Sequence, residues 1–556
     1  MSKIFTAVIV SGLLLWGSLA GAWPSAPDAN LVICDRTGEQ TVPKLAAAPD
    51  GGCYVSWFDH GGASYAVYLQ RLDAQGNPLW AQNGLLISNN PQSTSLTDWD
   101  LAVDSTNSAI VVFNDTRTDA NRDIYAYRIS PDGEFLWGAN GIALSATGNT
   151  DFEADPRVII SSAGNVIIAW QGASGGHNAV KIRKLSLAGA DLWTPTTVAI
   201  TSTYGNDYPR IAPALEDGFV ASYVVRQGSS FSSPRHIYMQ KFDASGTVQW
   251  AAAGVPVFVG NGMGIQVKPF LLADSLGGAF CTWYDSRLGG INLRCWAQHI
   301  LSDATVSWTA NGVQTDTSTV RMQMSPVACR IPGTQEIIVA YLESDASQGN
   351  FSIGAQRIGS TGARQWTNAG ILYSPLDPLQ ESNILCYSVG DGAVVVFEKL
   401  LSFGGQNSGV EAFRVDGTGA MVWETSPRVM CSVSSIKMRL AADVNRFGQV
   451  MATWPDGRVD PSWDLYLQNI NPDGSLGNLP VVTIDAPQEV TVAPVGSDIH
   501  LRWHSVTGAT SYNIRAGTDM MDFGTLVGSV TDTTATLPGE SDAQTKRFYY
   551  VSAVRN

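Results

Sequence analysis

The sequence predicts an all-β protein: an eight-bladed β-propeller of four-stranded repeats, each about 57 residues long, followed by a small β-sandwich. Composition is the first observation. Of the 556 residues 44% are hydrophobic and only 15% charged, with 55 Gly and 17 Trp. These values exclude a disordered chain, a coiled coil and a helical bundle. Many Gly and aromatic residues with few charges are typical of strands joined by tight turns.

The second observation is a Gly followed four residues later by Trp. The copies are Gly76/Trp80, Gly133/Trp137, Gly189/Trp193, Gly246/Trp250, Gly362/Trp366 and Gly419/Trp423, with Ala304/Trp308 in the one gap. Successive Trp residues are 56 to 58 positions apart. An eighth copy keeps Gly474 but has Asn478 in place of the Trp.

The third observation is an aromatic residue at the end of a β-type run, with the same period. Its copies are Trp57, Phe113, Trp170, Tyr223, Trp283, Tyr341, Phe397 and Trp454. Two independent markers in register indicate eight structural repeats.

Each repeat contains four short apolar or alternating segments, which predict four strands. In the second repeat they cover residues 100–104, 109–113, 124–129 and 141–145, separated by turns rich in Asn, Asp and Gly. Eight units of four antiparallel strands describe a β-propeller. An elongated solenoid is the alternative.

A closed ring needs a partner for its last sheet, because an open end exposes an unpaired edge strand. Residues 28–36 resemble the fourth strand of a repeat, yet they precede the first full repeat. We therefore predict that they dock as the outer strand of the eighth blade. The expected organisation is a signal peptide at 1–22, the propeller at 23–480 and the sandwich at 481–556.

The N-terminus predicts export. Lys3, an apolar stretch over 4–16 and the sequence Ala20-Gly21-Ala22 fit a secretory signal cleaved before Trp23. The apolar stretch is shorter than the roughly 20 residues of a membrane span, which disfavours an uncleaved anchor and any membrane insertion. We expect a secreted or cell-surface protein, with the periplasm as an alternative.

The formal charge of −15 at pH 7 disfavours nucleic acid and anionic membranes as partners, and no Lys/Arg run or Arg–aromatic cluster offers a local exception. The seven Cys include no C-x-x-C pair or zinc spacing, so no transition metal is predicted. Cys281 and Cys295, on expected neighbouring strands, are the best disulfide candidate.

The pattern D-x-R-x-D-x-x-x-D follows two of the second strands and supplies the candidate binding residues. They are Asp115, Arg117, Asp119 and Asp123, then Asp456, Arg458, Asp460 and Asp464, with the first half repeated as Asp285 and Arg287. Three carboxylates in one loop could hold Ca²⁺ or grip a sugar. An Asp–Arg bond that closes the loop is the structural alternative, and repetition in several blades favours it. No cofactor is therefore predicted, with Ca²⁺ as the one candidate.

Beyond residue 485 the repeats stop. Asp498–Trp503, Ser505–Ile514 and Phe548–Val554 resemble the B, C and F strands of a fibronectin type III domain. The resemblance implies a small sandwich that spaces or presents other domains.

Leu72–Trp80 resembles the tryptophan-docking turn of quinoprotein (PQQ-dependent) propellers. This resemblance implies the fold; the adjacent Cys pair of the related alcohol dehydrogenases is missing. The whole chain resembles uncharacterised secreted bacterial propeller proteins with C-terminal fibronectin type III-like domains.

No G-x-S-x-G elbow, P-loop, dinucleotide fingerprint or H-E-x-x-H motif is present. We therefore expect a non-catalytic protein that binds a glycan or a surface or extracellular protein. One alternative is a propeller enzyme, either a glycoside hydrolase or lyase or a quinoprotein, which requires a non-repeated acidic cluster in the channel with a perturbed carboxylate. A self-associating component of an extracellular assembly is the other.

Overall fold

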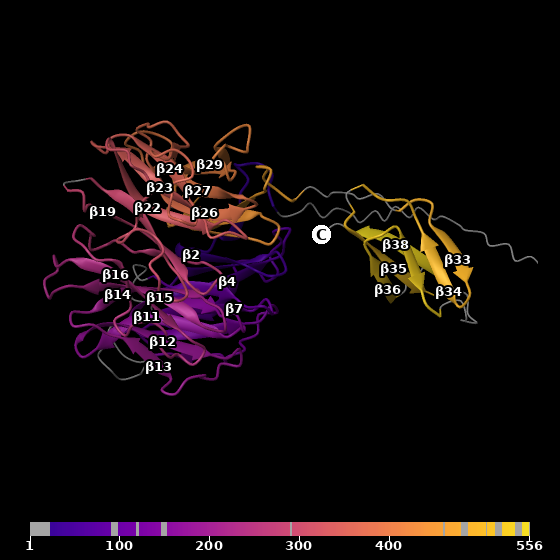
Figure 1. Ribbon diagram of the computed structural model, residues 1–556, viewed down its shortest axis with the longest axis horizontal. Coiled ribbons are helices and arrows are strands. Elements are labelled where there is room, and N and C mark those ends of the chain that lie inside the picture. Colours follow the sequence, from indigo (N-terminus) through magenta and orange to yellow (C-terminus); the bar gives the residue numbers. More distant parts are fainter. Residues whose placement is uncertain are drawn as a thin grey trace, which may run out of the picture. The chain divides into compact units, whose positions relative to one another are not determined.

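The computed structural model describes residues 23–90, 98–117, 122–145, 153–289, 292–459, 462–479, 487–507, 509–517, 525–539 and 548–554. All regular secondary-structure elements within these ranges are β-strands, which confirms the predicted all-β class. The chain divides into two compact units, Met1–Asn478 and Leu479–Asn556 (Figure 1). Within the described ranges no helix is long and apolar enough to cross a membrane.

The N-terminal unit contains eight antiparallel sheets of four strands. Sheet one is β2 (Glu39–Ala47), β3 (Cys53–His60), β4 (Ala66–Leu72) and β5 (Leu85–Ser88). Sheet two is β6 (Asp100–Val103), β7 (Ala109–Asp115), β8 (Asp123–Ile129) and β9 (Ile142–Ala143). Sheet three is β10 (Ala154–Ile160), β11 (Val166–Ser174), β12 (His177–Leu185) and β13 (Thr197–Ile200). Sheet four is β14 (Asn206–Pro213), β15 (Phe219–Arg226), β16 (Arg235–Phe242) and β17 (Val255–Phe258).

The remaining four sheets follow the same order. Sheet five is β18 (Phe270–Ala273), β19 (Ala279–Asp285), β20 (Arg294–Ile300) and β21 (Val313–Gln314). Sheet six is β22 (Arg321–Arg330), β23 (Ile337–Asp345), β24 (Phe351–Ile358) and β25 (Ile371–Leu372). Sheet seven is β26 (Glu381–Val389), β27 (Gly392–Leu400), β28 (Asn407–Val415) and β29 (Arg428–Ile436). Sheet eight is β30 (Ala441–Val444), β31 (Val450–Asp456), β32 (Asp464–Ile470) and β1 (Leu31–Cys34).

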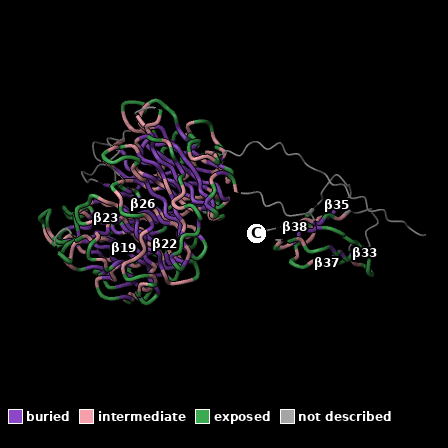
Figure 2. The backbone as a smooth tube through the Cα atoms, turned by 90° about the horizontal axis from the view of Figure 1, so that it is seen from above, coloured by how far each residue is buried: buried purple, intermediate pink, exposed green. Residues whose placement is uncertain are grey.

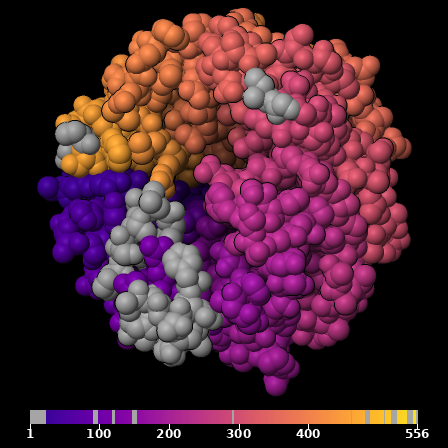
Figure 3. All heavy atoms as spheres, turned by 90° about the vertical axis from the view of Figure 1, so that its left-hand side faces the viewer, coloured from indigo at the N-terminus to yellow at the C-terminus, as the bar shows by residue number. Residues whose placement is uncertain are grey.

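The first strands of the sheets are neighbours in sequence order. Each contacts the first strand of the next sheet, from β2 through to β30, and β30 contacts β2. This order closes a ring, and Figure 3 shows the chain's colours following one another around a central hollow. The N-terminal unit therefore has a propeller-like repeat fold, with the first strands around a central channel.

The last sheet is completed by the N-terminal strand. β1 pairs antiparallel with β32, with Leu31 opposite Leu467 and Val32 opposite Tyr466. This pairing joins the two ends of the N-terminal unit within one sheet. It also covers the edge that β32 would otherwise leave open.

The second strands are mostly buried, apart from positions toward their C-terminal ends, because each lies in the middle of a sheet that packs between two others. β7 and β31 contain no residue outside the buried class. Their sequences are continuous apolar runs rather than alternating ones, as expected for strands covered on both faces. Figure 2 shows the buried residues concentrated along the strands of this unit.

Each Trp of the first marker docks on the following repeat. Its indole nitrogen donates a hydrogen bond to a backbone oxygen of the next turn, at 2.9 to 3.1 Å. A Cβ on the next marker Gly would come within 2.6 to 3.7 Å of the ring or its neighbours at most of these turns. Gly at positive φ therefore lets the chain approach the indole closely. Ala304 adopts the same left-handed conformation, with φ 74°.

The eighth indole comes from the N-terminus. Trp23 donates to Ala74 O at 3.0 Å, and a Cβ on Gly76 would lie 2.6 Å from its ring. Trp23 is only 3% exposed. It thus occupies the junction between sheets eight and one, where Asn478 has replaced the repeat's own Trp.

The disulfide predicted between Cys281 and Cys295 is wrong. On the paired strands β19 and β20, Cys281 lies opposite Gln298 and Cys295 lies opposite Tyr284. The two thiols also belong to different core clusters. Strand adjacency alone did not fix the register, and the actual register places the side chains on opposite faces of the sheet.

A different pair of cysteines lies close enough to bond. The Sγ atoms of Cys329 on β22 and Cys386 on β26 are 3.5 Å apart, across the junction of sheets six and seven. We expect refolding in a glutathione redox buffer to join them, with oxidised glutathione taking up the two electrons and two protons. A disulfide closing this loop is expected to stabilise the fold by about 2–4 kcal/mol.

Peptide mapping after alkylation of the unfolded protein checks this prediction. Cys329→Ser should lower the denaturation midpoint of the oxidised protein and leave that of the reduced protein nearly unchanged. Recovery of seven alkylated thiols from protein refolded in the oxidising buffer would contradict it.

The C-terminal unit contains two three-stranded sheets. One is β33 (Thr491–Val495), β34 (Asp498–Arg502) and β37 (Thr534–Leu537); the other is β36 (Thr525–Val530), β35 (Ser511–Gly517) and β38 (Phe548–Val554). Leu501, Trp503, Tyr512 and Ile514 are in its core. The period-2 pattern of β34 buries Ile499 and Leu501 and exposes the residues between them.

Candidate functional site

The D-x-R loops form compact buried ion pairs. Arg117 Nη2 lies 2.6 Å from Asp115, and the backbone N–H of Arg117 also donates to that carboxylate. The guanidinium stacks on the ring of Tyr125, 3.7 Å from its centroid. Asp285/Arg287 and Asp456/Arg458 repeat this geometry, each with an ion pair of 2.6 Å. Each of these Asp residues is thus paired with the Arg of its own loop, which favours the structural role.

The later carboxylates of the pattern that the structure describes lie on the neighbouring strand. Asp123 and Asp464 begin the third strands β8 and β32, opposite Asp115 and Asp456. Asp119 and Asp460 lie outside the described residues. Among those that are described, no group of three or more His, Cys, Asp or Glu side chains is arranged to hold a metal ion. Ca²⁺ binding by the complete loops stays a prediction.

The acid of the D-x-R pair occupies a repeated position, two residues after the strand-end aromatic. Asp59 pairs there with Arg36 at 3.4 Å, and Glu343 pairs there with Arg321. Asp59, Asp115, Asp285, Glu343 and Asp456 are all at most 2% exposed. Such burial prevents contact with a substrate, so we exclude this position from the candidate active site.

Glu343 makes the pH dependence of this position testable. Burial and the neighbouring Asp316 raise the pKa of Glu343 to about 9, although Arg321 opposes the shift. The folded state therefore favours protonated Glu343, and its stabilisation is lost as pH rises from the unfolded pKa near 4.5 through the folded value. Between pH 6 and 8 we expect the wild type to lose about 2 kcal/mol of unfolding free energy that Glu343→Gln retains.

Denaturant unfolding at the two pH values measures this difference, because glutamine fills the same space without titrating. Asp132→Asn, at an exposed turn, is the matched control and should follow the wild type. Equal pH slopes for Glu343→Gln and the wild type would contradict the prediction.

The first strands share a bulge that turns side chains toward the channel. Six of the eight have a non-glycine residue at φ between 48° and 55°: Val42, Asp155, Tyr208, Ser325, Asn383 and Arg439. The strand register shifts at five of these positions. Bulges re-aim side chains and are frequent beside active sites. Left-handed Val and Tyr are strained, so the surrounding fold must impose this conformation.

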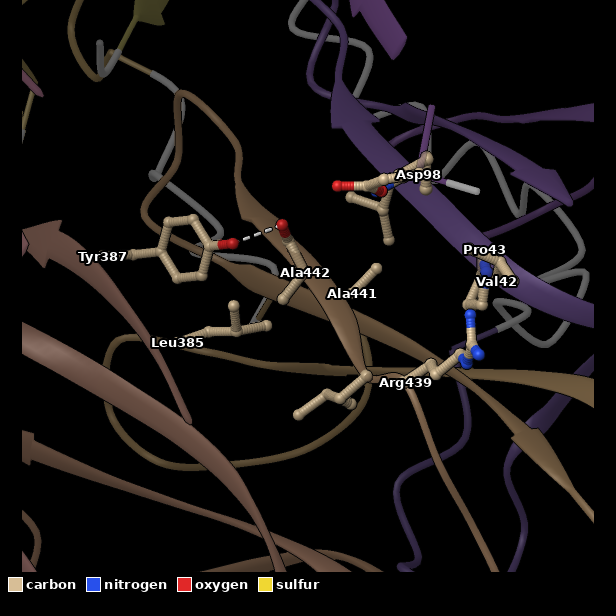
Figure 4. A pocket seen from close by; sticks show the side chains of 11 residues that line it. Val42, Pro43, Asp98, Leu385, Tyr387, Arg439, Ala441 and Ala442 are labelled. Carbon is tan, nitrogen blue, oxygen red and sulfur yellow. Dashed lines mark hydrogen bonds and ion pairs between the residues drawn. The ribbon is translucent and has the colours of Figure 1, made fainter. Parts of the chain in front are cut away.

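A cavity of about 380 Å³ opens at this level between sheets seven, eight, one and two. Its polar lining is Lys44, Asp98, Tyr387 and Arg439; the rest comes from Val42, Pro43, Leu45, Leu385, Leu440, Ala441 and Ala442. Figure 4 shows Arg439 reaching toward Val42 and Pro43, and Tyr387 on the far side from them. The cavity thus combines one apolar wall with a few charged groups, as ligand sites generally do.

Asp98 is the carboxylate of this cavity. It forms an ion pair with Lys44 at 2.7 Å and a second with Arg157. Burial alone would raise its pKa, but Arg157 and Lys44 hold the pKa of Asp98 well below its usual range. Its side chain keeps 27% exposure. Asp98 is therefore an ionised carboxylate that a bound molecule can reach.

Asp443 is the second unusual carboxylate of the channel strands. It accepts hydrogen bonds from the backbone N–H groups of Ala47, at 2.9 Å, and Val444, at 2.8 Å. Burial nevertheless raises the pKa of Asp443 above its ordinary value. The residue is half-buried. Asp443 thus favours the protonated form more than Asp98 does.

Both carboxylates lie against β2. Asp98 contacts Lys44, and Asp443 contacts Ala47, three residues further along the strand. About 10 Å of strand separates these two contact points, which leaves room for a sugar ring. Asp443 has no acidic counterpart at its position in the neighbouring repeats, whereas the position of Asp98 is acidic again at Asp155, 57 residues later.

Sequence reasoning missed Asp98 and Asp443. A signal was nevertheless present. Val42-Pro43-Lys44, Asp155-Pro156-Arg157 and Tyr208-Pro209-Arg210 share one pattern at one repeat position, where the side chains differ from sheet to sheet. Variation within an otherwise repeated strand marks the surface that the repeats do not need for packing.

No protein-family model and no curated protein matches the chain. Among solved structures it is similar to a puromycin hydrolase, with 14% identity and a TM-score of 0.41, covering 78% of this chain and 61% of that one. An ulvan lyase of polysaccharide lyase family PL25 has 12% identity, a TM-score of 0.42 and coverage of 70% and 96%. The α-L-arabinanase of Penicillium chrysogenum has 15% identity, a TM-score of 0.34 and coverage of 59% and 94%. This chain therefore spans less than two thirds of the puromycin hydrolase.

These similar proteins are enzymes, and this finding overturns the expectation of a non-catalytic binding protein. That expectation rested on the lack of local catalytic motifs. The inference was unsafe because residues from different sheets of such a ring can form a site without any local motif. The likeness shows the fold alone, so the activity must be argued from this chain's own residues.

Proposed function

We propose that this chain is an exported enzyme built on an eight-bladed β-propeller followed by a fibronectin type III-like domain. Eight four-stranded sheets, eight Trp docking contacts and a first strand that completes the last sheet support the propeller. Two three-stranded sheets with Trp503 and Tyr512 in their core support the second domain. The signal-like sequence of residues 1–22, with cleavage predicted before Trp23, supports export.

We further propose that the enzyme cleaves glycosidic bonds in the channel cavity. One observation carries this proposal: two carboxylates beside the same strand have pKa values displaced in opposite directions. Such divergence assigns acid and base roles to paired carboxyl groups. Glycoside hydrolysis requires one protonated and one ionised carboxyl group on either side of the bond.

In the proposed reaction Asp443 donates its proton to the leaving glycosidic oxygen as the bond to the anomeric carbon breaks. Asp98 accepts a proton from the attacking water, whose oxygen forms the new bond to that carbon. A proton returned through solvent from Asp98 to Asp443 restores both groups. Lys44 and Arg157 keep Asp98 ionised and hold it in position.

A panel of purified polysaccharides tests the proposal. Released reducing ends report cleavage, and ultraviolet absorbance of unsaturated sugars distinguishes elimination from hydrolysis. We expect hydrolysis of at least one substrate by the wild type and by Asp132→Asn, whose carboxylate is exposed at a turn, and none by Asp98→Asn. Equal activity of Asp98→Asn and the wild type would refute this site, and unsaturated products would replace hydrolysis with a lyase reaction.

A further inference from the structure

The charged side chains around the channel extend beyond the cavity. At the level of the bulges, the described residues supply five cations and three carboxylates. The cations are Lys44, Arg157, Arg210, Lys268 and Arg439, and the carboxylates are Asp98, Asp100 and Asp155. The excess of cations is local, because the whole chain has a net charge of −15. The sequence showed no Lys/Arg run because these residues come from five different sheets.

Arg157 and Arg210 occupy equivalent positions on β10 and β14. Arg157 is paired with Asp98 and donates to the backbone oxygens of Trp99 and Pro156 at 3.3 and 3.0 Å. Arg210 donates to Pro209 O at 2.8 Å. No carboxylate of the described residues forms an ion pair with Arg210.

The pKa of Arg210 indicates that its surroundings supply too little negative charge to balance the guanidinium. Burial and the neighbouring Arg157 lower the pKa of Arg210 to about 10, although Asp98, Asp155 and Asp100 oppose the shift. An arginine in such a place is stabilised by an anion that it can bind through two parallel hydrogen bonds. Arg210 is half-buried, so an anion in the channel can reach it.

Lys268 lies on the same side of the channel. Its Nζ is 3.5 Å from Asp155, on the first strand two sheets away, and 5.3 Å from the centre of the Tyr208 ring between them. Its side chain is 40% exposed. Lys268 therefore lies beside Tyr208, which precedes Arg210 by two residues on the same strand.

From these contacts we infer that Arg210 and Lys268 bind the anionic group of an acidic sugar, with that group a carboxylate or a sulfate. The inference rests on the proposed function, because it assigns the substrate class of the same channel. The Tyr208 ring suits contact with a sugar face. A long nucleic acid is disfavoured because the rest of the protein repels it.

Calorimetric titration of the full chain tests the inference. The probes are galacturonate oligosaccharides, sulfated galactan oligosaccharides and neutral arabinan oligosaccharides, and Asp443→Asn serves as background if a probe is cleaved. We expect an acidic probe to bind and the neutral one to bind more weakly. Arg210→Ala should weaken binding of the acidic probe about ten- to a hundredfold, since a charge-assisted hydrogen bond is lost. Arg210→Lys should lose less, because it keeps the charge without the bidentate geometry.

Arg446→Ala is the matched control, because Arg446 is exposed in the turn between β30 and β31 and stacks only on Phe447. It should bind all probes as the wild type does. Preference for the galacturonate or the sulfated probe identifies the anionic group. Equal binding of acidic and neutral probes, no acidic binding, unchanged affinity in folded Arg210→Ala, or equal binding of a single-stranded DNA oligonucleotide would overturn the inference.

Binding and cleavage fail separately in this design. Arg210-dependent binding without cleavage of any polysaccharide would preserve the acidic-sugar site and refute the proposed enzyme. Cleavage abolished by Asp98→Asn, with acidic binding unaffected by Arg210→Ala, would preserve the enzyme and refute the site. Matching denaturation midpoints of the variants and the wild type show that the fold is intact in each case.

Discussion

Asp98→Asn is expected to lower kcat/KM for the best polysaccharide by about a hundred- to ten-thousandfold, the contribution of a positioned general base. Asparagine keeps the size of the side chain and hydrogen bonding to Lys44 but removes the charge that Arg157 and Lys44 stabilise. Steady-state kinetics with the full chain measure the effect. We expect the change in kcat, with KM less affected, because the charge acts on the reaction more than on binding.

Asp443→Asn is the companion variant and separates the two roles. An amide has no acid proton to give, so the cleavage rate of a substrate with a poor leaving group should lose the full general-acid contribution. The cleavage rate of a nitrophenyl glycoside, whose leaving group needs little protonation, should fall much less. Asp98→Asn should instead damage both substrates alike.

The pH profile provides an independent check on these roles. Because the pKa of Asp443 is raised, activity should fall as pH increases through that raised value; because the pKa of Asp98 is depressed, the acid side of the profile should remain active down to low pH. An equal loss of activity on both substrates in Asp443→Asn would contradict the assignment. So would a pH profile that neither substitution changes.

Trp23→Ala is expected to destabilise the N-terminal unit by about 3–5 kcal/mol, the usual effect of truncating a buried Trp. Trp23 is 3% exposed and donates to Ala74 O at 3.0 Å. Its loss leaves a cavity at the junction where the two ends of the ring meet. Denaturant unfolding, with the midpoint and slope compared with the wild type, measures this effect.

Trp23→Phe keeps most of the ring but not the indole N–H, so we expect it to lose only about 1–2 kcal/mol. Limited proteolysis gives a second readout, because release of β1 from β32 should expose residues 24–38 to cleavage in Trp23→Ala. An unchanged midpoint together with an unchanged proteolytic pattern would show that the indole does not close the ring.

The repeats could be predicted from the sequence because each uses the same local chemistry. A Trp that docks on the next turn favours Gly at positive φ there, as between Trp193 and Gly246, where a Cβ would lie 2.9 Å from the ring. A strand covered on both faces requires a continuous apolar run, as in β7. These requirements recur every 57 residues or so, and recurrence makes them visible without a structure.

The role of Trp23 was visible only in part. It stands 57 residues before Trp80 and so keeps the period of the Trp marker, but Leu19 replaces the Gly four residues earlier, and the predicted cleavage point lies directly before Trp23. Only the closed ring brings it to Gly76, where the eighth junction lacks an indole of its own. Asn478 marks the degenerate eighth repeat, and nothing in its sequence points to the indole that replaces the missing Trp.

The candidate site was even harder to predict from the sequence. Asp98, Arg157 and Arg210 lie on three sheets, and their contacts join residues more than fifty positions apart. The D-x-R loops stood out because their charges are close in sequence, yet the same closeness lets them pair with one another. Local motifs therefore pointed to the stabilising ion pairs and away from the channel.

Sequence alone determined the all-β class, the period, the strand-forming segments and the docking Trp residues, because these depend on interactions within one repeat or between adjacent ones. Tertiary structure alone decided which Cys thiols meet, which residue completes the eighth junction, and which carboxylates share the channel. These depend on strand register and on the closure of the ring. Closure brings first strands that are distant in sequence around one axis. The pKa values of Asp98 and Asp443 follow from neighbouring residues that only this arrangement supplies.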